Sequence, residues 1–474
     1  MSVVLEHFKK ITSIPHGSGN EKQLSNYLVS FAQDNGLEVV QDKALNVYIY
    51  KPASEGYESS PTVILQGHMD MVCEKDKKTK FNFEKDALKL ETNGDFLKAQ
   101  GTTLGADDGV AIAYQMAILE DKTLKHPPLC MLMTTEEETG MGGVIALAPD
   151  LIEGKTLINL DTDNEGDFFV SCAGGVRVKL TLNGLTVAVS PGEEVYNIKV
   201  RGLKGGHSGA EIHKERANAN VVIGRVLDTL NKEFNIGVCS VDGGSKDNVI
   251  TREADATITI AIEKANTLKQ KVAELDKILK SEYNAQDSDI NISIIKSKAE
   301  NKFIADTKQK LIDLLRILPN GVISKSRSIE NLVETSLNIG VISTTDNTIT
   351  ITLSLRSSLE SKKNDLKRRL NTIAKVIGVR FNESGDYPAW QYSEKSRLRD
   401  VATELYKKMY DKEANIRAVH AGLECGILSQ KVDGLDMISF GPNVYDIHTP
   451  QERMSISSFE RVYNFLIKML EKLK

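Results

Sequence analysis

The sequence predicts an α/β fold of two domains, in which a mixed-sheet α/β domain is interrupted by an inserted α+β domain. At 474 residues the chain is too long for one compact core. Short apolar runs that end in acidic residues or histidine occur in both terminal parts, whereas the middle contains alternating, half-exposed strands with helices between them. We therefore expect one domain from residues 1–180 and 386–474, and the inserted domain from residues 181–385.

The composition excludes several classes of partner. Hydrophobic residues make up 41% and charged residues 26%, and the formal charge of -5 provides no basic field for nucleic acid or anionic membrane. The five cysteines are scattered and form no Cys-x-x-Cys pair, which argues against a disulfide framework and a cysteine zinc site. No signal peptide or membrane-spanning stretch is recognisable. We expect a cytoplasmic protein with a small or peptidic substrate.

The first elements are a packing helix and two short strands. Apolar residues recur at helical spacing over residues 21–35, and Gly36 follows where a helix would end. Residues 37–40 and 47–50 are rich in residues that favour strands. We therefore expect this region to support the fold rather than to contribute residues to a functional site.

The next strand carries the first candidate site residues. Val63, Ile64 and Leu65 predict a buried strand that delivers His68 to its C-terminal end, where open α/β sheets bind ligands. Asp70 lies on the same side of the extended chain, so its carboxylate can accept a hydrogen bond from the imidazole nitrogen that faces away from a metal. An isolated His-x-Asp motif is also compatible with a purely structural histidine.

Three further stretches place acids at the ends of predicted elements. Asp107 and Asp108 lie between glycines at the start of a predicted helix. The helix dipole favours one carboxylate at this position but does not explain two. The apolar run 129–133 ends in three glutamates at 136–138, and the run 156–160 ends at Asp161. Adjacent carboxylates repel unless a cation compensates them. The recurrence indicates a metal site at one edge of the sheet.

The middle of the chain predicts the inserted domain, and the last part returns to the first pattern. Residues 195–200 alternate like a strand, the glycine-rich loop 202–209 carries His207, and residues 336–342 and 348–355 predict a hairpin. In the last part, residues 416–420 and 437–440 are strand-like and lead into Glu424 and His448. The final helix is expected to begin with a capping box formed by Ser457 and Glu460.

The motifs in this order resemble a known superfamily. The order His68-x-Asp70, Gly105-Ala-Asp107, Glu137-Glu138-x-Gly140, Asp161 and His448 is similar to that of the dinuclear zinc aminopeptidases, carboxypeptidases and aminoacylases. Within it the chain resembles the cytosolic Xaa-His dipeptidases, also called aminoacyl-histidine dipeptidases or bacterial carnosinases. The segments that resemble this branch are 105–109, 172–175, 202–209, 211–213, 333–338 and 420–426. The resemblance spans nearly the whole chain and implies a metallopeptidase with an α/β catalytic domain and an inserted lid.

The resemblance implies two divalent metal ions, zinc being expected and manganese or cobalt the alternatives. Asp107 would bridge the two metals, His68 and Asp161 would complete one site, and Glu138 and His448 the other. Imidazole and carboxylate are suitable zinc ligands, so the chemistry of the residues agrees. Glu137 would be the general base, and His207 would stabilise the tetrahedral oxyanion.

The resemblance also implies substrate contacts and leaves a choice of register. Arg356 is similar to the arginine that binds the dipeptide carboxylate, and Asn248 is similar to an asparagine near the oxyanion or carboxylate. Glu424 could receive the free α-amine. The alternative is that Glu424 is only a carboxylate at a helix N-terminus. The motif Glu-Glu-x-Gly aligns Glu137 and Glu138 with the base and the ligand. A shift by one residue would make Glu136 the base and Glu137 the ligand.

Three functions follow for testing. The first is a metal-dependent dipeptidase that hydrolyses unblocked dipeptides, including Xaa-His such as β-alanyl-histidine. The second is an N-acyl-amino-acid deacylase or amidohydrolase on the same metal core, and Glu424 favours the peptidase because a neutral acyl group needs no acid. The third is a catalytically inactive binding protein, against which the complete ligand set argues. The metal used, the preferred first residue and a homodimer through the lid are left open.

Overall fold

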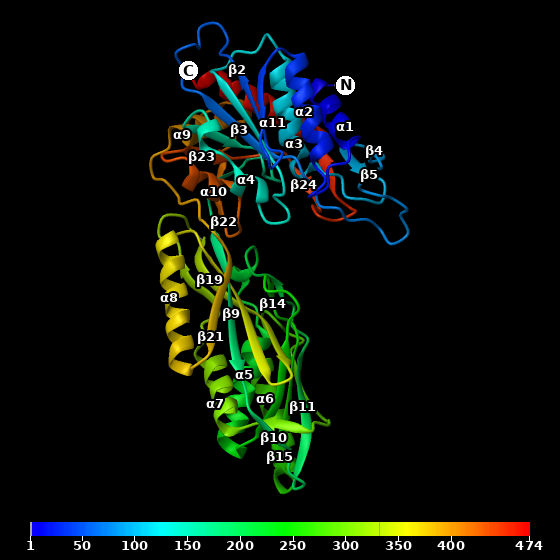
Figure 1. Ribbon diagram of the computed structural model, residues 1–474, viewed down its shortest axis with the longest axis vertical. Coiled ribbons are helices and arrows are strands. Elements are labelled where there is room, and N and C mark those ends of the chain that lie inside the picture. The colour runs from blue at the N-terminus through cyan, green and yellow to red at the C-terminus, as the bar shows by residue number, and fades with distance from the viewer. Residues whose placement is uncertain (1, 331) are drawn as a thin grey trace. The chain divides into compact units, whose positions relative to one another are not determined.

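The computed structural model describes residues 2–330 and 332–474, which form two compact units (Figure 1). The first unit comprises residues 1–171, 392–418 and 423–474, and the second comprises residues 172–391 and 419–422. The sequence-based limits of the insertion, 181 and 385, lie a few residues inside those of the second unit. A chain that leaves one unit and returns to it is the arrangement expected of an inserted domain.

An eight-stranded sheet forms the centre of the first unit, in the order β1-β2-β6-β3-β7-β23-β8-β22. Its middle strands β6, β3, β7 and β23 run parallel, while β2 and β8 pair with them in antiparallel fashion. The sheet is therefore mixed, as the sequence predicts. The strands are β1 (Glu38–Gln41), β2 (Val47–Lys51), β3 (Val63–His68), β6 (Leu129–Thr134), β7 (Thr156–Asn159), β8 (Asp167–Cys172), β22 (Asn415–Val419) and β23 (Asp436–Ser439).

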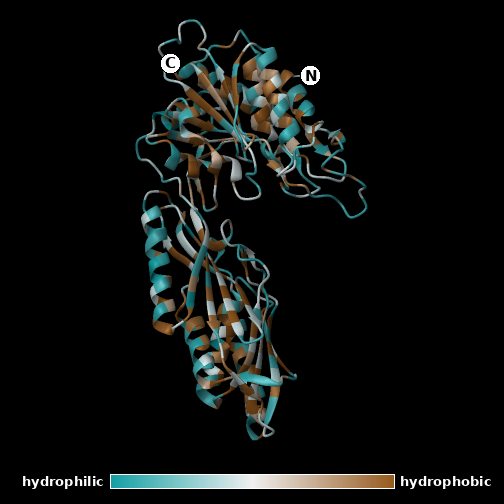
Figure 2. Cartoon of the chain, in the orientation of Figure 1, coloured by the Kyte–Doolittle hydropathy of each residue, from teal (hydrophilic) through white to brown (hydrophobic). Residues whose placement is uncertain are grey.

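Helices cover this sheet and close the larger core. Helix α3 packs on β3, and helices α1 and α11 pack on α3. Along α11 the apolar side chains recur every three to four residues and are buried, so one face of the helix joins the core. Figure 2 shows hydrophobic and hydrophilic residues together on these outer helices. The helices are α1 (Val3–Thr12), α2 (Lys22–Asp34), α3 (Ala106–Glu120), α4 (Gly142–Ala146), α9 (Arg397–Tyr410), α10 (Glu424–Lys431) and α11 (Ile456–Lys472).

A small antiparallel sheet in the order β24-β25-β5-β4 joins residues 90–99 to residues 444–455. A turn at Asn93 and Gly94 connects β4 to β5. The predicted capping box of the last helix is wrong, because Ser455, not Ser457, is the N-cap and accepts a hydrogen bond from the Ser458 amide. The strands are β4 (Leu90–Asn93), β5 (Phe96–Ala99), β24 (Val444–Tyr445) and β25 (Arg453–Ser455).

Among the described residues, the second unit is a nine-stranded antiparallel sheet with four α-helices. The strand order is β16-β11-β15-β13-β19-β20-β9-β21, with β18 paired to β19. The predicted hairpin is confirmed, since β19 and β20 pair up to the turn between Thr345 and Thr348. The strands are β9 (Gly174–Asn183), β11 (Glu193–Arg201), β13 (Gly237–Gly243), β15 (Ala254–Ala261), β16 (Asn291–Lys296), β18 (Gly321–Lys325), β19 (Val333–Thr345), β20 (Thr348–Ser357) and β21 (Arg380–Tyr387).

Helices α5 and α7 pack together, α5 also packs on β15 and β11, and α8 packs on β20 and β9. Their buried leucine, isoleucine and valine side chains form a second core that is separate from the core of the first unit. Two short ladders, β10-β17 and β12-β14, complete the unit. The remaining elements are β10 (Thr186–Ala188), β12 (Gly206–His207), β14 (Val249–Ile250), β17 (Asn301–Phe303), α5 (Ala219–Phe234), α6 (Ala265–Tyr283), α7 (Ala305–Ile317) and α8 (Glu360–Ile377).

Candidate active site

The candidate site lies at the carboxyl ends of the parallel strands of the first unit. Strand β3 ends at His68, its neighbour β6 leads directly to the glutamates at 136–138, and β7 leads to Asp161. The register places His68 opposite Thr134, so the two strands end at the same level. Because parallel strands deliver their ends to one edge, residues far apart in the sequence meet there.

One group of candidate ligands contains His68, Asp107 and Asp161. One ligand atom from each residue lies within 4.8 Å of the others. The imidazole Nε2 of His68 is 3.1 Å from Oδ1 of Asp107, and the His68 side chain is buried. Burial and the charge of Asp107 raise the pKa of Asp161 to about 8. A bound cation would relieve this repulsion between the two carboxylates.

A second group contains Asp107, Glu138 and His448, so Asp107 is common to both groups. Nε2 of His448 lies 3.3 Å from Oδ2 of Asp107 and 2.8 Å from Oε1 of Glu138. Hydrogen bonds that the imidazole donates to these two carboxylates raise the pKa of His448 to about 10. Each oxygen of Asp107 therefore faces a different histidine, as expected of a carboxylate that bridges two metals.

The donor set fits zinc, because it consists of imidazole nitrogen and carboxylate oxygen without thiolate. The structure brings together all five residues predicted as ligands, in the same two groups that the resemblance implies. In both histidines the Nε2 atom, which would bind a metal, lies near hydrogen-bonding distance of an acidic oxygen. Divalent cations are the partners that make such a concentration of carboxylates favourable.

Asp70 holds two segments of the site together. Its Oδ2 accepts a hydrogen bond from the Ser18 hydroxyl at 2.7 Å, and its Oδ1 accepts one from the Glu137 amide at 3.0 Å. The Nδ1 atom of His68 lies 3.0 Å from the backbone carbonyl of Asp70 and 3.4 Å from its carboxylate. The main-chain oxygen, rather than the carboxylate expected from the sequence, is the nearer partner of the imidazole.

The two candidate base residues differ in environment. Glu136 is exposed and has a left-handed backbone, with its carboxylate directed toward Gly142. Glu137 is partly buried and forms a group with His68 and Glu138 within 4.8 Å, to which Glu136 does not belong. Burial raises the pKa of Glu137 well above its usual value, a direction that suits a proton acceptor. This geometry favours the register with Glu137 beside the ligand Glu138.

Glu424 is a buried carboxylate with one unused oxygen. Its Oε2 accepts hydrogen bonds from Gln66 at 2.5 Å and Thr134 at 2.6 Å, and both donors belong to the central strands. Its Oε1 is buried and lacks a partner among the described residues. Burial raises the pKa of Glu424 to about 7. An acceptor left unpaired at 1% exposure is suited to an incoming cationic group.

His207 lies in the second unit, on the short ladder β12-β14. Its Nδ1 accepts hydrogen bonds from the amides of Gly209 at 3.3 Å and Ala210 at 3.0 Å, so in the neutral ring the proton resides on Nε2. Burial, followed by the positive charge of Arg356, lowers its pKa. A neutral imidazole with a free Nε2–H is a suitable donor for a developing oxyanion.

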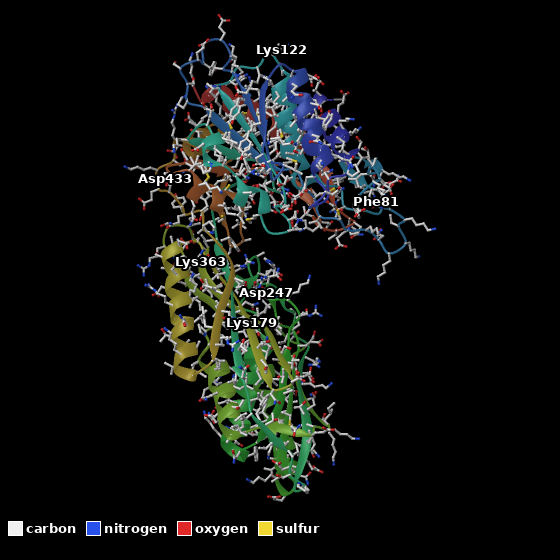
Figure 3. The ribbon with its side chains drawn as sticks, in the orientation of Figure 1. Phe81, Lys122, Lys179, Asp247, Lys363 and Asp433 are labelled. Carbon is white, nitrogen blue, oxygen red and sulfur yellow. The ribbon has the colours of Figure 1, made fainter. Side chains whose placement is uncertain are left out.

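Asn248 is held beside His207 by its main chain. Its carbonyl accepts a hydrogen bond from the Ser208 amide, and the buried Asn338 side chain donates to the carbonyls of Asp247 and Val249 on either side, both at 2.8 Å. Figure 3 labels Asp247, whose carboxylate pairs with an arginine of β9. Asn338 was not identified from the sequence, because its contacts span about 90 residues.

Arg356 belongs to the same unit and stands opposite Ser336 in the β19-β20 ladder. Its Nη1 donates to the Tyr387 hydroxyl at 2.9 Å, and its Nε is buried without a partner among the described residues. Its neighbour His420 is hydrogen-bonded to the Ser336 hydroxyl at 2.7 Å, a contact that suits a structural role for that histidine. A half-buried guanidinium with donors to spare is a site for an anion.

Two proteins named as dipeptidases are similar to this chain over nearly their whole lengths. The chain is 38% identical over 468 residues to the cytosol non-specific dipeptidase of Escherichia coli strain K12, covering 98% of this chain and 96% of that protein. Its structure matches that of aminoacylhistidine dipeptidase from Vibrio alginolyticus with a TM-score of 0.93 and 35% identity, covering 99% and 96% of the two chains.

More distant structures share the fold. The dipeptidase Dug1p from Saccharomyces cerevisiae matches with a TM-score of 0.52 at 12% identity, covering 99% of this chain and 95% of that chain. Among residues 2–330 and 332–474, no helix has the length and apolar character needed to cross a bilayer. Residues 64–472 match the profile described as Peptidase family M20/M25/M40. The chain therefore belongs to peptidase family M20/M25/M40.

Proposed function

We propose that this protein is a metal-dependent dipeptidase that hydrolyses unblocked dipeptides, including Xaa-His such as β-alanyl-histidine. The names of the E. coli and V. alginolyticus relatives support the dipeptidase activity. The observation that carries the proposal is the pair of ligand groups that share Asp107, with Glu137 next to the ligand Glu138. The name of the first relative also supports a cytoplasmic location.

We assign one metal to His68, Asp107 and Asp161, and the other to Asp107, Glu138 and His448. Zinc is the proposed metal because the donors are nitrogen and oxygen. Two bound zinc ions would polarise the scissile carbonyl and supply the attacking water at neutral pH. Asp70 keeps the His68 ring in position through its backbone carbonyl and holds the acidic loop through its carboxylate.

The proton transfers are assigned to Glu137. Its carboxylate takes a proton from the attacking water and returns it to the leaving amine, so the net reaction adds one water across the peptide bond. Its raised pKa matches this double role, because the group must both accept and donate near neutral pH. The Nε2–H of His207 is assigned to the oxyanion of the tetrahedral species.

Substrate recognition uses opposite charges. We assign the free α-amine to the unpaired oxygen of Glu424, and the C-terminal carboxylate to Arg356 with Asn248 nearby. The amine assignment separates a dipeptidase from a deacylase, since an N-acyl group offers no cation to a buried acid. A homodimer formed through the second unit stays a prediction, which the mass in solution will test.

Hydrolysis assays test the function directly. The purified protein is incubated with β-alanyl-histidine, glycyl-histidine and an N-acetylated amino acid, each with and without a chelator. Cleavage of the free dipeptides alone, lost with the chelator and restored by zinc, is the expected result. Cleavage of the acetylated compound alone would make the protein a deacylase. Absence of cleavage after reloading with zinc, manganese or cobalt would refute the substrate class.

A further inference from the structure

A buried carboxylate outside the residues discussed so far contacts the loop that precedes Asp107. Glu452 is 2% exposed, and both of its oxygens are used. Its Oε2 accepts hydrogen bonds from the amides of Leu104 at 2.8 Å and Gly105 at 3.2 Å, and its Oε1 accepts one from the amide of Ala106 at 2.8 Å. One side chain thus binds three successive backbone N–H groups.

The local backbone explains why these amides need a side-chain acceptor. Gly105 has a φ of +70° and is the N-cap of α3, so the amide of Ala106 at the first helical position has no partner within the helix, and the amides of Leu104 and Gly105 precede the helix. Gly105 has no side chain that could cap them. Successive amides that converge at such a turn form a small anion-binding concavity, which Glu452 fills from a segment almost 350 residues away.

The positions of the two segments connect this contact to the metal centre. Asp107 directly follows the three bound amides, and Glu452 lies four residues after His448. Asp107 and His448 face each other in the second ligand group, with 3.3 Å between Nε2 and Oδ2. The backbone that carries each of these two residues is therefore attached to the other through Glu452.

We propose that Glu452 is a positioning residue for the metal centre, which fixes the loop of Asp107 against the loop of His448. The inference rests on the metal centre proposed above. Without the carboxylate, three buried amides would lose their acceptor and the two loops would no longer be held in register. Replacing a residue that orients a metal ligand without binding the metal itself typically lowers metal affinity or activity by about 10- to 100-fold.

Glutamine is the informative replacement. It has the shape of glutamate, but only one of its two terminal atoms accepts hydrogen bonds, so at least one of the three amides must face an NH₂ group. Glu452→Asp retains the charge on a side chain that is one methylene shorter, and serves as a second variant in case Glu452→Gln does not fold. Both variants leave every proposed ligand in place.

Asp287 provides a matched control in the second unit. It is fully buried, and its carboxylate accepts hydrogen bonds from the amides of Lys204 and Ala217, both at 2.8 Å. Asp287→Asn therefore also removes a buried acceptor of backbone amides, but in the unit that contains none of the proposed metal ligands. A loss of stability common to both variants can thus be separated from an effect on metal binding.

The experiment compares metal binding in the purified wild-type protein, Glu452→Gln, Glu452→Asp and Asp287→Asn. Zinc affinity is measured by competition with a chromogenic chelator, the ligand geometry by the visible absorption of the cobalt-loaded protein, and stability by thermal unfolding of the metal-free forms. We expect Glu452→Gln to bind the weaker of two zinc ions about 10- to 100-fold less tightly, with an altered cobalt spectrum. Glu452→Asp should show a smaller loss, and Asp287→Asn the wild-type affinity.

Wild-type zinc affinity and cobalt spectra in both Glu452 variants, with lowered thermal stability alone, would overturn the inference and leave Glu452 a helix cap. An equal loss of zinc affinity in Asp287→Asn would also overturn it, because general destabilisation would then be the cause. A wild-type protein that binds no zinc, manganese or cobalt would instead refute the metal centre and the proposed function. The failure of the inference and that of the function are therefore distinguishable.

Discussion

Replacing Glu137 with glutamine should remove most of the turnover and leave metal binding intact. Glutamine has nearly the same shape as glutamate but cannot take a proton from water at neutral pH. The loop should keep its conformation, because Asp70 binds the main-chain amides of residues 137 and 138 rather than the Glu137 side chain. Glu138, the proposed ligand, is unchanged.

The size of the effect follows from the role. A positioned general base contributes about 10²- to 10⁴-fold to a rate. Since a factor of ten corresponds to about 1.36 kcal/mol, the loss amounts to about 2.7–5.4 kcal/mol of transition-state stabilisation. Glu137 lies within 4.8 Å of His68 and Glu138, next to the proposed metal site. Because a general base acts in the transition state, the full loss is expected in kcat, with KM changed little.

Glu136→Gln is the matched control, because it makes the same chemical change one residue earlier on an exposed side chain. Its effect on kcat should be about twofold or less, as for other surface substitutions. The assay is steady-state hydrolysis of glycyl-histidine by protein whose zinc content has been measured. Loss of turnover in Glu136→Gln, together with loss of zinc in Glu137→Gln, would refute the reasoning and establish the shifted register.

Three further substitutions test recognition and stability. Glu424→Gln should lower kcat/KM about 10- to 100-fold for β-alanyl-histidine, because a charge-assisted hydrogen bond to the amine is lost, and should change little the inhibition of that reaction by propionyl-histidine, which lacks the amine; equal losses of hydrolysis and inhibition in steady-state assays would contradict the amine site. Arg356→Lys should lower kcat/KM to a similar extent for glycyl-histidine, because lysine lacks the planar fork, but not for glycyl-histidinamide; the same assay on both compounds decides. Burial, with the charge of Arg356, lowers the pKa of His420 from 6.5 to about 3. The stability that depends on neutral His420 is therefore complete above pH 6.5. It is lost as the pH falls toward 3, by up to about 1.4 kcal/mol of unfolding free energy per pH unit. Urea unfolding between pH 7 and 4.5 should therefore show a flatter pH dependence for His420→Asn than for wild type, and parallel curves would contradict this origin.

Much of the fold was predictable because its signals are local. The spacing of apolar residues over 21–35 predicts a helix, and α2 occupies Lys22–Asp34. The run before His68 predicts a buried strand, and β3 is buried at all six positions. Both patterns depend on residues a few positions apart, where the period of the backbone is readable without knowledge of the rest of the chain.

Element ends were less predictable, because local alternatives differ little in energy. Ser455 and Ser457 are both good N-cap residues, and the sequence favoured Ser457 since Glu460 follows it at the right spacing. In the structure Ser455 is the N-cap, and it is also the last residue of β25, where it pairs with Phe96 of β5. Tertiary pairing thus decided between two serines that could each cap the helix.

The sequence by itself determined which residues could bind metal and substrate, since the resemblance and the residue types single out His68, Asp107, Glu138, Asp161 and His448. Only the tertiary structure decided that the ligand atoms of each predicted group lie within 4.8 Å of one another, that the backbone rather than the carboxylate of Asp70 is nearest to the His68 ring, and that Glu452 ties the two loops together. The physical reason is range: residue chemistry and periodicity are local, whereas a site is made by contacts between segments hundreds of residues apart, which exist only after both cores have formed.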